Sequence, residues 1–391
     1  MINTTMATKP KMLFVSTRFP LPLHSGFANK NFNFLKYFSD SYDISILIIS
    51  RDIPCKKDLD EMKKLVADVY VFKPKPYDIF LGLINVIFKA YPIQFSFFYS
   101  RLAHRKILEI QEDFDIVFGS VIRSWQYISD FNIPIYVDLA DSLSETYKRN
   151  YKTLNNPIYK FVYFLESILL FNIERRLVKK ASGSFLFNEH EVNALNAYGN
   201  VIKVPHGVHP HLLDDIKSGT KYKNDLIIFG KMDFHPNVDA VFWFVENVLP
   251  SLPKEIKLII IGASPSDSIN MLGKKNLRVD VIGFVDDPYP LISGALASIA
   301  PIRLGGGIQN KVLESLAVGA NVVVSKMVAD SMPDKHESGI IECNSVDDWI
   351  QNITKIYLKQ INSNSEKSKS YIRNRFTWKA YAKAIELNIN E

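Results

Sequence analysis

The feature that most constrains this fold is a repeated alternation of short apolar runs with helical stretches. In the first half, apolar runs at residues 11–17, 43–50 and 67–72 alternate with helical spacing of apolar residues, as over residues 29–38. This order of strand, helix and strand predicts a doubly wound parallel sheet, whose ligands bind beyond the carboxyl ends of the strands. The alternation restarts at Asp225, so the sequence predicts two α/β units.

Length and composition agree with two units and exclude several classes of protein. A chain of 391 residues is too long for one compact core, and 47% hydrophobic against 23% charged residues is typical of a well-packed globular protein. The net charge of +6 is spread along the chain, which gives nucleic-acid binding little support. The cysteines are Cys55 and Cys343, far apart, so we expect no disulfide framework and a reducing compartment.

The sequence predicts neither a signal peptide nor a membrane span. The N-terminus, MINTTMATKPK, lacks a long apolar segment, and the apolar stretch 79–98 is interrupted by Lys89 and Pro92. We therefore expect a protein that is soluble or peripherally bound to a membrane. A helical pattern over residues 156–180 is dense in aromatic residues, which fits either a core helix or an amphipathic surface facing a membrane.

A glycine-rich loop stands out in the second half, where Gly305, Gly306 and Gly307 precede a short helical pattern that carries Lys311 and Glu314. Glycines let the backbone turn sharply and bring its N–H groups close to a ligand. At a helix N-terminus such N–H groups form a site for an anion, most naturally a phosphate. The loop therefore predicts a phosphate site, to which flanking cations would add charge.

Several ordered segments resemble one family. The segments LIIFGKMDFHPNVDA, KLIIIGASP and APIRLGGGIQNKVLESLAVGA resemble the C-terminal half of a GT-B glycosyltransferase of the family 4, or group 1, kind. The resemblance is closer to the branch found in bacterial polysaccharide gene clusters, whose members carry PN-x-DA and GGGIQNK-x-LE. It covers most of residues 226–325.

The resemblance implies an α/β fold of the GT-B type, with two Rossmann-like, doubly wound domains facing each other across a cleft. Residues 1–208 would form the acceptor-binding domain and residues 209–372 the nucleotide-sugar-binding domain. A C-terminal helix over residues 373–391 would pack back on the N-terminal domain.

The implied function is that of a retaining glycosyltransferase, hexosyl or related. Such an enzyme moves a sugar from a nucleotide-diphosphate donor to a saccharide or lipid-linked acceptor. The expected setting is synthesis of a bacterial surface polysaccharide, that is, capsule, exopolysaccharide or lipopolysaccharide. We expect a cytoplasmic protein, with peripheral contact to the cytoplasmic face of the inner membrane. No cofactor and no metal are expected, because lysine, arginine and a helix N-terminus can balance the phosphate charge.

The resemblance also implies the donor-binding residues. Glu314 matches the second glutamate of the family's E-x7-E motif and would bind the ribose, whereas Gly306 stands in place of the first glutamate. This replacement leaves the donor sugar open. Asn237, in the PN-x-DA segment, would either bind the donor or cap the following helix. The expected donor-binding set is Lys231, Phe284, Val285, Arg303, Gly305, Gly306, Gly307, Ile308, Gln309, Asn310, Lys311 and Glu314.

Candidate acceptor-side residues follow apolar runs in the first half. Asp138 and Asp141 follow the run 133–137 and match a D-x-x-D-x-x-S pattern of the family branch, so either would orient the acceptor hydroxyl or act as its base. Together with Glu314 they form the predicted catalytic set. Ser25 and Gly26 belong to the first loop, which would lie against the donor phosphates or the acceptor.

Three further patterns bear on the function. Asp113 and Asp115 form a D-x-D pair, but Asp115 falls at the amino end of its predicted strand, the wrong edge for a ligand. The histidines of the segment PHGVHPH lack a nearby cysteine or acidic ligand, which favours a hinge over a zinc site. Finally, Gly306 keeps a non-catalytic GT-B partner of a polysaccharide machinery as the alternative function.

Overall fold

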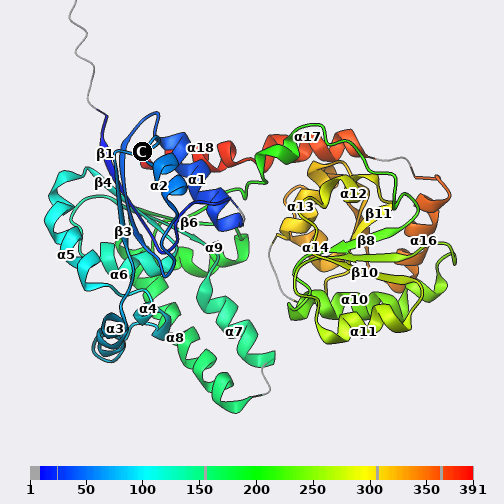
Figure 1. Ribbon diagram of the computed structural model, residues 1–391, viewed down its shortest axis with the longest axis horizontal. Helices are drawn as coiled ribbons and strands as arrows, with labels where there is room; N and C mark the ends of the chain where they lie inside the picture. The colour runs from blue at the N-terminus through cyan, green and yellow to red at the C-terminus, as the bar shows by residue number, and fades with distance from the viewer. Residues whose placement is uncertain (1–8, 24, 154–155, 305–307, 362–363, 391) are drawn as a thin grey trace, which may run out of the picture. The chain divides into compact units, whose positions relative to one another are not determined.

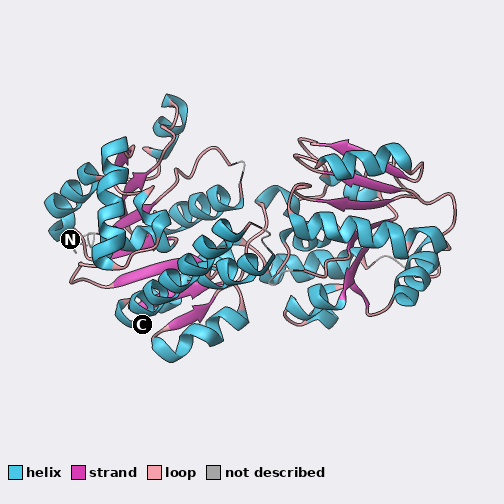
Figure 2. Cartoon of the chain, turned by 90° about the horizontal axis from the view of Figure 1, so that it is seen from below, coloured by secondary structure: helices cyan, strands magenta, loops and turns pink. Residues whose placement is uncertain are grey.

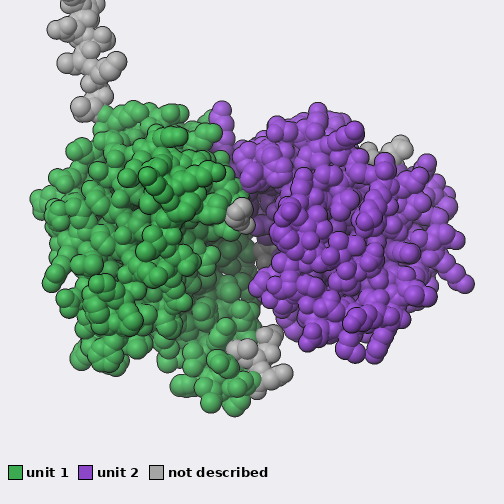
Figure 3. Space-filling model, in the orientation of Figure 1, with its two compact units in different colours: residues 1–205, 381–391 green, residues 206–380 purple. Residues whose placement is uncertain are grey.

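The computed structural model describes residues 9–23, 25–153, 156–304, 308–361 and 364–390. The chain forms two compact units, shown in different colours in Figure 3. Unit 1 comprises residues 1–205 and 381–391, and unit 2 comprises residues 206–380. Each unit holds one parallel sheet with helices on both of its faces (Figures 1 and 2), as the alternation of apolar runs and helical stretches predicts.

Unit 1 contains a seven-stranded sheet in the order β3-β2-β1-β4-β5-β6-β7, with all pairs parallel. The order reverses between β1 and β4, which is the switch point at which doubly wound sheets bind ligands. The strands are β1 (Lys11–Ser16), β2 (Asp43–Ile49), β3 (Asp68–Phe72), β4 (Ile116–Ser120), β5 (Ile135–Ala140), β6 (Gly183–Leu186) and β7 (Val201–Lys203).

The helices of unit 1 connect its parallel strands. They are α1 (Gly26–Phe38), α2 (Lys56–Met62), α3 (Pro76–Lys89), α4 (Ile93–Ser96), α5 (Arg101–Ile110), α6 (Trp125–Ile128), α7 (Leu143–Thr153), α8 (Pro157–Lys180) and α9 (Glu189–Leu195).

A row of aromatic rings fills one face of the first sheet. Phe14 of β1 stacks on Phe118 of β4 with ring centroids 5.8 Å apart, and Phe118 stacks on Phe185 of β6 at 6.2 Å. Phe34 of α1 closes over this row, 4.2 Å from the ring of Phe118. These rings form the core on one face of the sheet, and the strands are apolar on both sides because helices cover both faces.

Unit 2 contains a six-stranded parallel sheet in the order β10-β9-β8-β11-β12-β13, with its switch point between β8 and β11. Its strands are β8 (Leu226–Phe229), β9 (Leu258–Ile261), β10 (Val279–Gly283), β11 (Ala297–Ala300), β12 (Val322–Ser325) and β13 (Ile341–Cys343). Its helices are α10 (His235–Asn247), α11 (Asp267–Lys275), α12 (Tyr289–Gly294), α13 (Asn310–Ala317), α14 (Lys326–Ser331), α15 (Lys335–Ser338), α16 (Val346–Tyr357) and α17 (Ser365–Arg375).

Helix α18 (Trp378–Ile389) begins in unit 2 and ends in unit 1. Its Tyr381 is buried and donates a hydrogen bond to Asp138 Oδ2 at the end of β5. Asp138 is also paired with buried Lys30 (Nζ to Oδ2, 2.5 Å) and accepts a hydrogen bond from the backbone N–H of Ala140. Asp138 is therefore buried and holds α1 and α18 to the sheet. Its predicted part in catalysis stays a prediction.

The C-terminal segment forms α17 before it reaches α18. The chain is helical from Ser365, and Ser368, Tyr371 and Ile372 of α17 form a buried face. Residues up to Ala380 cluster with unit 2, and the part that belongs to unit 1 begins at Tyr381.

The anchoring role of Asp138 predicts a stability effect. Replacing Asp138 by alanine leaves the Lys30 ammonium buried without its opposing charge, so we expect the free energy of unfolding to fall by about 3–5 kcal/mol. Urea unfolding followed by circular dichroism measures this loss. Asp141→Ala, at an exposed neighbouring position, is the matched control and should cost much less. An Asp138→Ala protein of unchanged stability would contradict the anchoring role.

Candidate active site

Glycines lie at the carboxyl ends of three strands of the second sheet. Gly230 and Gly262 directly follow β8 and β9, and Gly283 is the last residue of β10. The N–H of Gly230 donates to Ile261 O, and the N–H of Gly262 donates to Gly283 O. Gly262 has no room for a side chain, since a Cβ would lie 1.7 Å from Gly230 O. Bare backbone therefore forms the carboxyl edge of the sheet beside its switch point.

Lys311 of α13 reaches this edge. Its Nζ donates a hydrogen bond to Asn237 Oδ1 over 2.5 Å, and Asn237 Nδ2 donates to the carbonyl oxygen of Lys231 over 2.8 Å. A Cβ on Gly230, whose φ is +136°, would stand 3.4 Å from Lys311 Nζ. Asn237 thus orients the lysine against the glycine edge. It does not cap α10, whose N-cap is Phe234.

The electrostatics of Lys311 are those of an incomplete ion pair. Burial lowers the pKa of Lys311 to about 8, although the nearby Glu314 acts to raise it. Among the carboxylates that the structure describes, none lies within ion-pair distance of Lys311 Nζ. An anion brought within hydrogen-bond distance of this ammonium would therefore add a close ion pair to the weaker attraction of Glu314.

Glu314 lies one helical turn after Lys311 and faces Tyr289, the first residue of α12. Burial raises the pKa of Glu314 to about 7, while a hydrogen bond from Tyr289 and the charge of Lys311 oppose this rise. Burial and Glu314 together raise the pKa of Tyr289 above its ordinary value, so the phenol keeps its proton and donates. A carboxylate fixed in this way can accept hydrogen bonds from ligand hydroxyls.

Arg303 follows β11 and forms a two-point contact with Asp239 of α10. Its Nη2 lies 2.8 Å from Asp239 Oδ1 and its Nε 3.3 Å from Oδ2, and the guanidinium also lies over the ring of Trp243. Asp239 and Asn237 both come from the PN-x-DA segment. This segment therefore positions the two cations that flank the glycine-rich loop.

The remaining predicted donor residues are placed as follows. Lys231 is exposed and pairs with Asp233 at 3.2 Å. Phe284, directly after Gly283, is 71% exposed, whereas Val285 packs against the core of unit 2. Ile308, Gln309 and Asn310 lead into or begin α13. Gly305, Gly306 and Gly307 lie outside the described residues.

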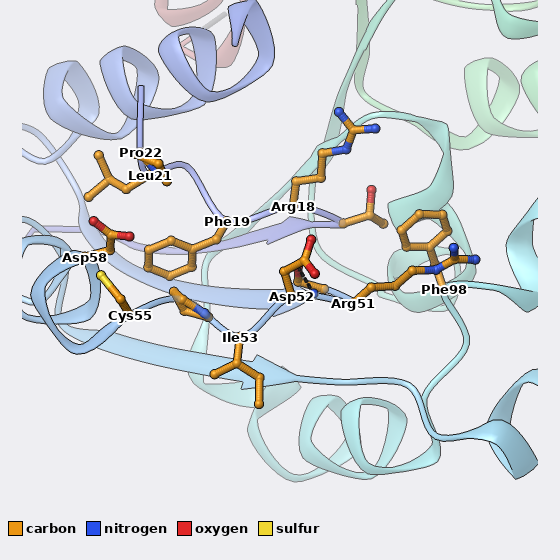
Figure 4. A pocket seen from close by; sticks show the side chains of 13 residues that line it. Arg18, Phe19, Leu21, Pro22, Arg51, Asp52, Ile53, Cys55, Asp58 and Phe98 are labelled. Atoms are coloured by element: carbon orange, nitrogen blue, oxygen red, sulfur yellow. Dashed lines mark hydrogen bonds between the residues drawn. The ribbon is translucent and has the colours of Figure 1, made fainter. Parts of the chain in front are cut away.

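Unit 1 has a cavity of its own at the carboxyl ends of β1 and β2 (Figure 4). The cavity has a volume of about 530 Å³ and is lined by the loop 17–22, by residues 50–55 and by Asp58 and Phe98. Arg18 and Arg51 follow β1 and β2 in corresponding positions, and Arg51 lies 5.7 Å from the ring centroid of Phe98. Polar, charged and aromatic side chains that surround one cavity suit a saccharide or phosphate group.

The sequence analysis missed these arginines. Arg123, whose Cζ lies 5.1 Å from the centroid of the Phe98 ring, adds a third guanidinium. Burial lowers the pKa of Arg123, and the charges of Arg18 and Arg51 lower it further. Their positions in the sequence could have identified them. Arg18 and Arg51 each come two residues after an apolar strand, and the carboxyl ends of these strands were expected to face a ligand.

The predicted residues of the first unit lie near its sheet edge. Asp141 is exposed directly after β5, and partial exclusion of solvent raises its pKa, against the attraction of Lys30. Ser25 accepts a hydrogen bond from the N–H of Ala28 and so caps α1, of which Gly26 is the first residue. The structure keeps Asp141 accessible and gives Ser25 at least a structural role.

No group of three or more metal-ligating side chains is assembled within the described ranges. His209 and His211 contact each other, and His211 packs on Tyr289 with ring centroids 5.4 Å apart. Asp115 accepts a hydrogen bond from the N–H of Lys11 at the amino edge of its sheet. Within the same described ranges, no helix has both the length and the apolar composition that crossing a bilayer requires.

Two doubly wound units with parallel sheets are the architecture that the GT-B resemblance implies. Residues 223–359, all within unit 2, match the model of the family Glycosyl transferases group 1. This match confirms the predicted enzyme class, a glycosyltransferase. A search of curated protein sequences finds no match.

Solved structures share the fold along the whole chain. HepE of Anabaena, in complex with UDP, superimposes with a TM-score of 0.65 at 12% identity and covers 97% of this chain and 99% of its own. TarM gives a TM-score of 0.66 at 13% identity with 100% of both chains covered. WaaG, a glycosyltransferase involved in lipopolysaccharide biosynthesis, gives 0.62 at 13% identity, with 96% and 99% covered. These similarities confirm the predicted GT-B fold.

The lowered pKa of Lys311 predicts a pH dependence of anion binding. Below about pH 8 the Lys311 ammonium is charged and attracts a diphosphate. Above this pH the amine is mostly neutral and must take up a proton before it can pair with the diphosphate, so binding is weaker. We expect the dissociation constant of a nucleoside diphosphate to rise by roughly tenfold between pH 7 and pH 9.5. Calorimetry at several pH values measures this change.

Lys311→Arg is the matched control, because arginine keeps its charge over this range and should bind with a flat profile. Identical profiles for the two proteins would show that another group governs the pH dependence.

Proposed function

We propose that this protein is a retaining glycosyltransferase that takes its sugar from a nucleoside-diphosphate donor. The observation that carries the proposal is the half-buried ammonium of Lys311, which Asn237 holds against the glycine edge of the second sheet, within the segment that matches group 1 glycosyltransferases. The similar structure of HepE was determined with UDP and with UDP-glucose, which supports a donor of this class.

Donor binding follows from the placement of side chains in unit 2. Lys311, with Arg303 and Lys231, would balance the diphosphate charge that grows as the leaving group departs. Glu314 would accept hydrogen bonds from the ribose hydroxyls, as its contact with Tyr289 fixes the carboxylate. Phe284 would offer an exposed aromatic face to the nucleobase.

The acceptor belongs to unit 1 in this proposal. The cavity between the loops that follow β1 and β2 has room for a saccharide, and Arg18, Arg51 and Asp52 can bind its hydroxyl or anionic groups. Asp141 is the accessible carboxylate of the predicted pair and would orient or deprotonate the acceptor hydroxyl, a role that the buried Asp138 leaves to it.

The chain's features favour a family 4 enzyme of bacterial surface polysaccharide synthesis, with a saccharide or lipid-linked acceptor at the cytoplasmic face of the inner membrane. The GGGIQNK and PN-x-DA segments support this branch. The proposal needs no metal ion, because Lys311 and Arg303 supply the positive charge beside the phosphates.

Donor hydrolysis without acceptor tests the proposal. A panel of nucleoside diphosphates is first ranked by the rise in melting temperature, and the matching nucleotide sugar is then used as substrate. We expect slow release of the nucleoside diphosphate, with kcat/KM lowered about a hundredfold by Lys311→Met. Lys326→Met, which removes an exposed lysine paired with Asp330 in the same unit, is the control and should leave the rate unchanged.

Two outcomes would redirect the proposal. Tight nucleotide binding without turnover on any acceptor or by hydrolysis would favour the alternative of a non-catalytic GT-B partner. Equal rates for the Lys311→Met and wild-type proteins would remove Lys311 from the reaction.

Retention is tested separately by proton NMR of the released sugar. With an α-linked nucleotide sugar, a retaining enzyme releases the α-anomer first, and the β-anomer appears only as the sugar equilibrates in water. Initial accumulation of the β-anomer would mean inversion and would contradict this part of the proposal.

A further inference from the structure

Helix α3 exposes the face that a surface helix ordinarily makes polar. The sequence predicts helices packed on the sheet in this region, but much of α3 is open to solvent. Phe80 is 65% exposed, Ile87 78% and Phe88 83%. Together with Tyr77, Leu83 and Ile84 these side chains recur every three or four residues, so they form one stripe along the helix.

The first half of α8 carries a second stripe of the same kind. Ile158 is 72% exposed and Phe161 65%, and Phe164, Leu165 and Ile168 continue the helical spacing. Glu166 of α8 accepts hydrogen bonds from the N–H groups of Ile93 and Gln94, and Arg176 donates to the carbonyl oxygen of Lys89. These contacts hold α8 beside α4 and the end of α3, at one end of unit 1 (Figure 1).

The acidic residues of these two helices are buried, whereas the basic residues on and beside them are exposed. The three acidic residues, Asp78, Glu166 and Glu174, are at most 2% exposed, and each accepts hydrogen bonds from backbone N–H groups. The basic residues are exposed, and no described carboxylate forms an ion pair with them. They are Lys73 and Lys75 before α3, Lys89 at its end, and Lys160, Arg175, Arg176, Lys179 and Lys180 on α8.

We propose that the stripes of α3 and α8, with these flanking cations, form a surface that docks on an anionic lipid bilayer. Isoleucine, leucine and phenylalanine side chains would enter the boundary between headgroups and acyl chains, while lysine and arginine contact lipid phosphates. The exposed Asp130, which acts on Tyr91 just beyond α3, marks an edge of the surface. This inference does not depend on the proposed sugar transfer.

The charge pattern favours a bilayer over a second copy of the chain. A symmetric dimer across this surface would bring two sets of unpaired cations together, and like charges placed opposite each other are unfavourable. An anionic bilayer satisfies the same cations and also removes the apolar stripes from water. Exposed apolar side chains gathered along two helices, as on α3 and α8, are typical of an interaction surface.

Vesicle co-sedimentation of the full-length protein tests the proposal. We expect binding to phosphatidylcholine vesicles that contain about a third phosphatidylglycerol, and weaker binding to phosphatidylcholine alone or at high salt. Ile87→Ser/Phe88→Ser and Ile158→Ser/Phe161→Ser should each weaken binding at least tenfold. Lys73→Glu/Lys160→Glu should reduce binding to the anionic vesicles only.

Leu277→Ser is the matched control, because Leu277 of unit 2 is 93% exposed yet lies outside the surface, so its loss should not change vesicle binding. Donor hydrolysis and melting temperature of the serine variants should equal those of the wild type, which separates this test from that of the proposed function. The proposal would be overturned if the wild-type protein did not co-sediment with anionic vesicles. A concentration-dependent dimer, detected by light scattering, that the serine variants abolish would also overturn it.

Discussion

The constraint on which the site of the second unit depends is a half-buried ammonium, that of Lys311, held by an amide and not by an ion pair. Lys311 lies where burial lowers its pKa, and a neutral amide, Asn237, holds it in place. A protein that kept this charge only for stability would gain more from an ion pair or an apolar side chain. The bare edge at Gly230 and the N-terminus of α13 are both suited to bring an anion to it.

Parallel topology brings the parts of this site together from distant positions in the chain. The PN-x-DA segment follows β8 and the GGGIQNK segment follows β11, and these two strands are neighbours at the switch point. Two side chains of the first segment therefore meet two cations of the second, as Asn237 with Lys311 and Asp239 with Arg303. The spacing within each segment can be read from the sequence. The strand order determines which side chains of the two segments contact each other.

The alternation of strands and helices, the class of enzyme and the helix that carries Lys311 and Glu314 were predicted from the sequence, because each leaves a local pattern. Contacts between distant parts of the chain leave no such pattern. The two carboxylates at the end of β5 look alike in sequence, and the contacts of Lys30 and Tyr381 with Asp138 distinguish them only in the folded chain. The cavity arginines and the exposed stripe of α3 were missed for the same reason: their neighbours are set by the fold.

A crystal structure of the protein with its preferred nucleoside diphosphate tests the central claim most directly. The account predicts phosphate oxygens within hydrogen-bond distance of Lys311 Nζ and of the backbone that follows β11, with the ribose against Glu314 and the base near Phe284. A diphosphate bound elsewhere, with the Lys311–Asn237 contact intact and closed to the ligand, would contradict it.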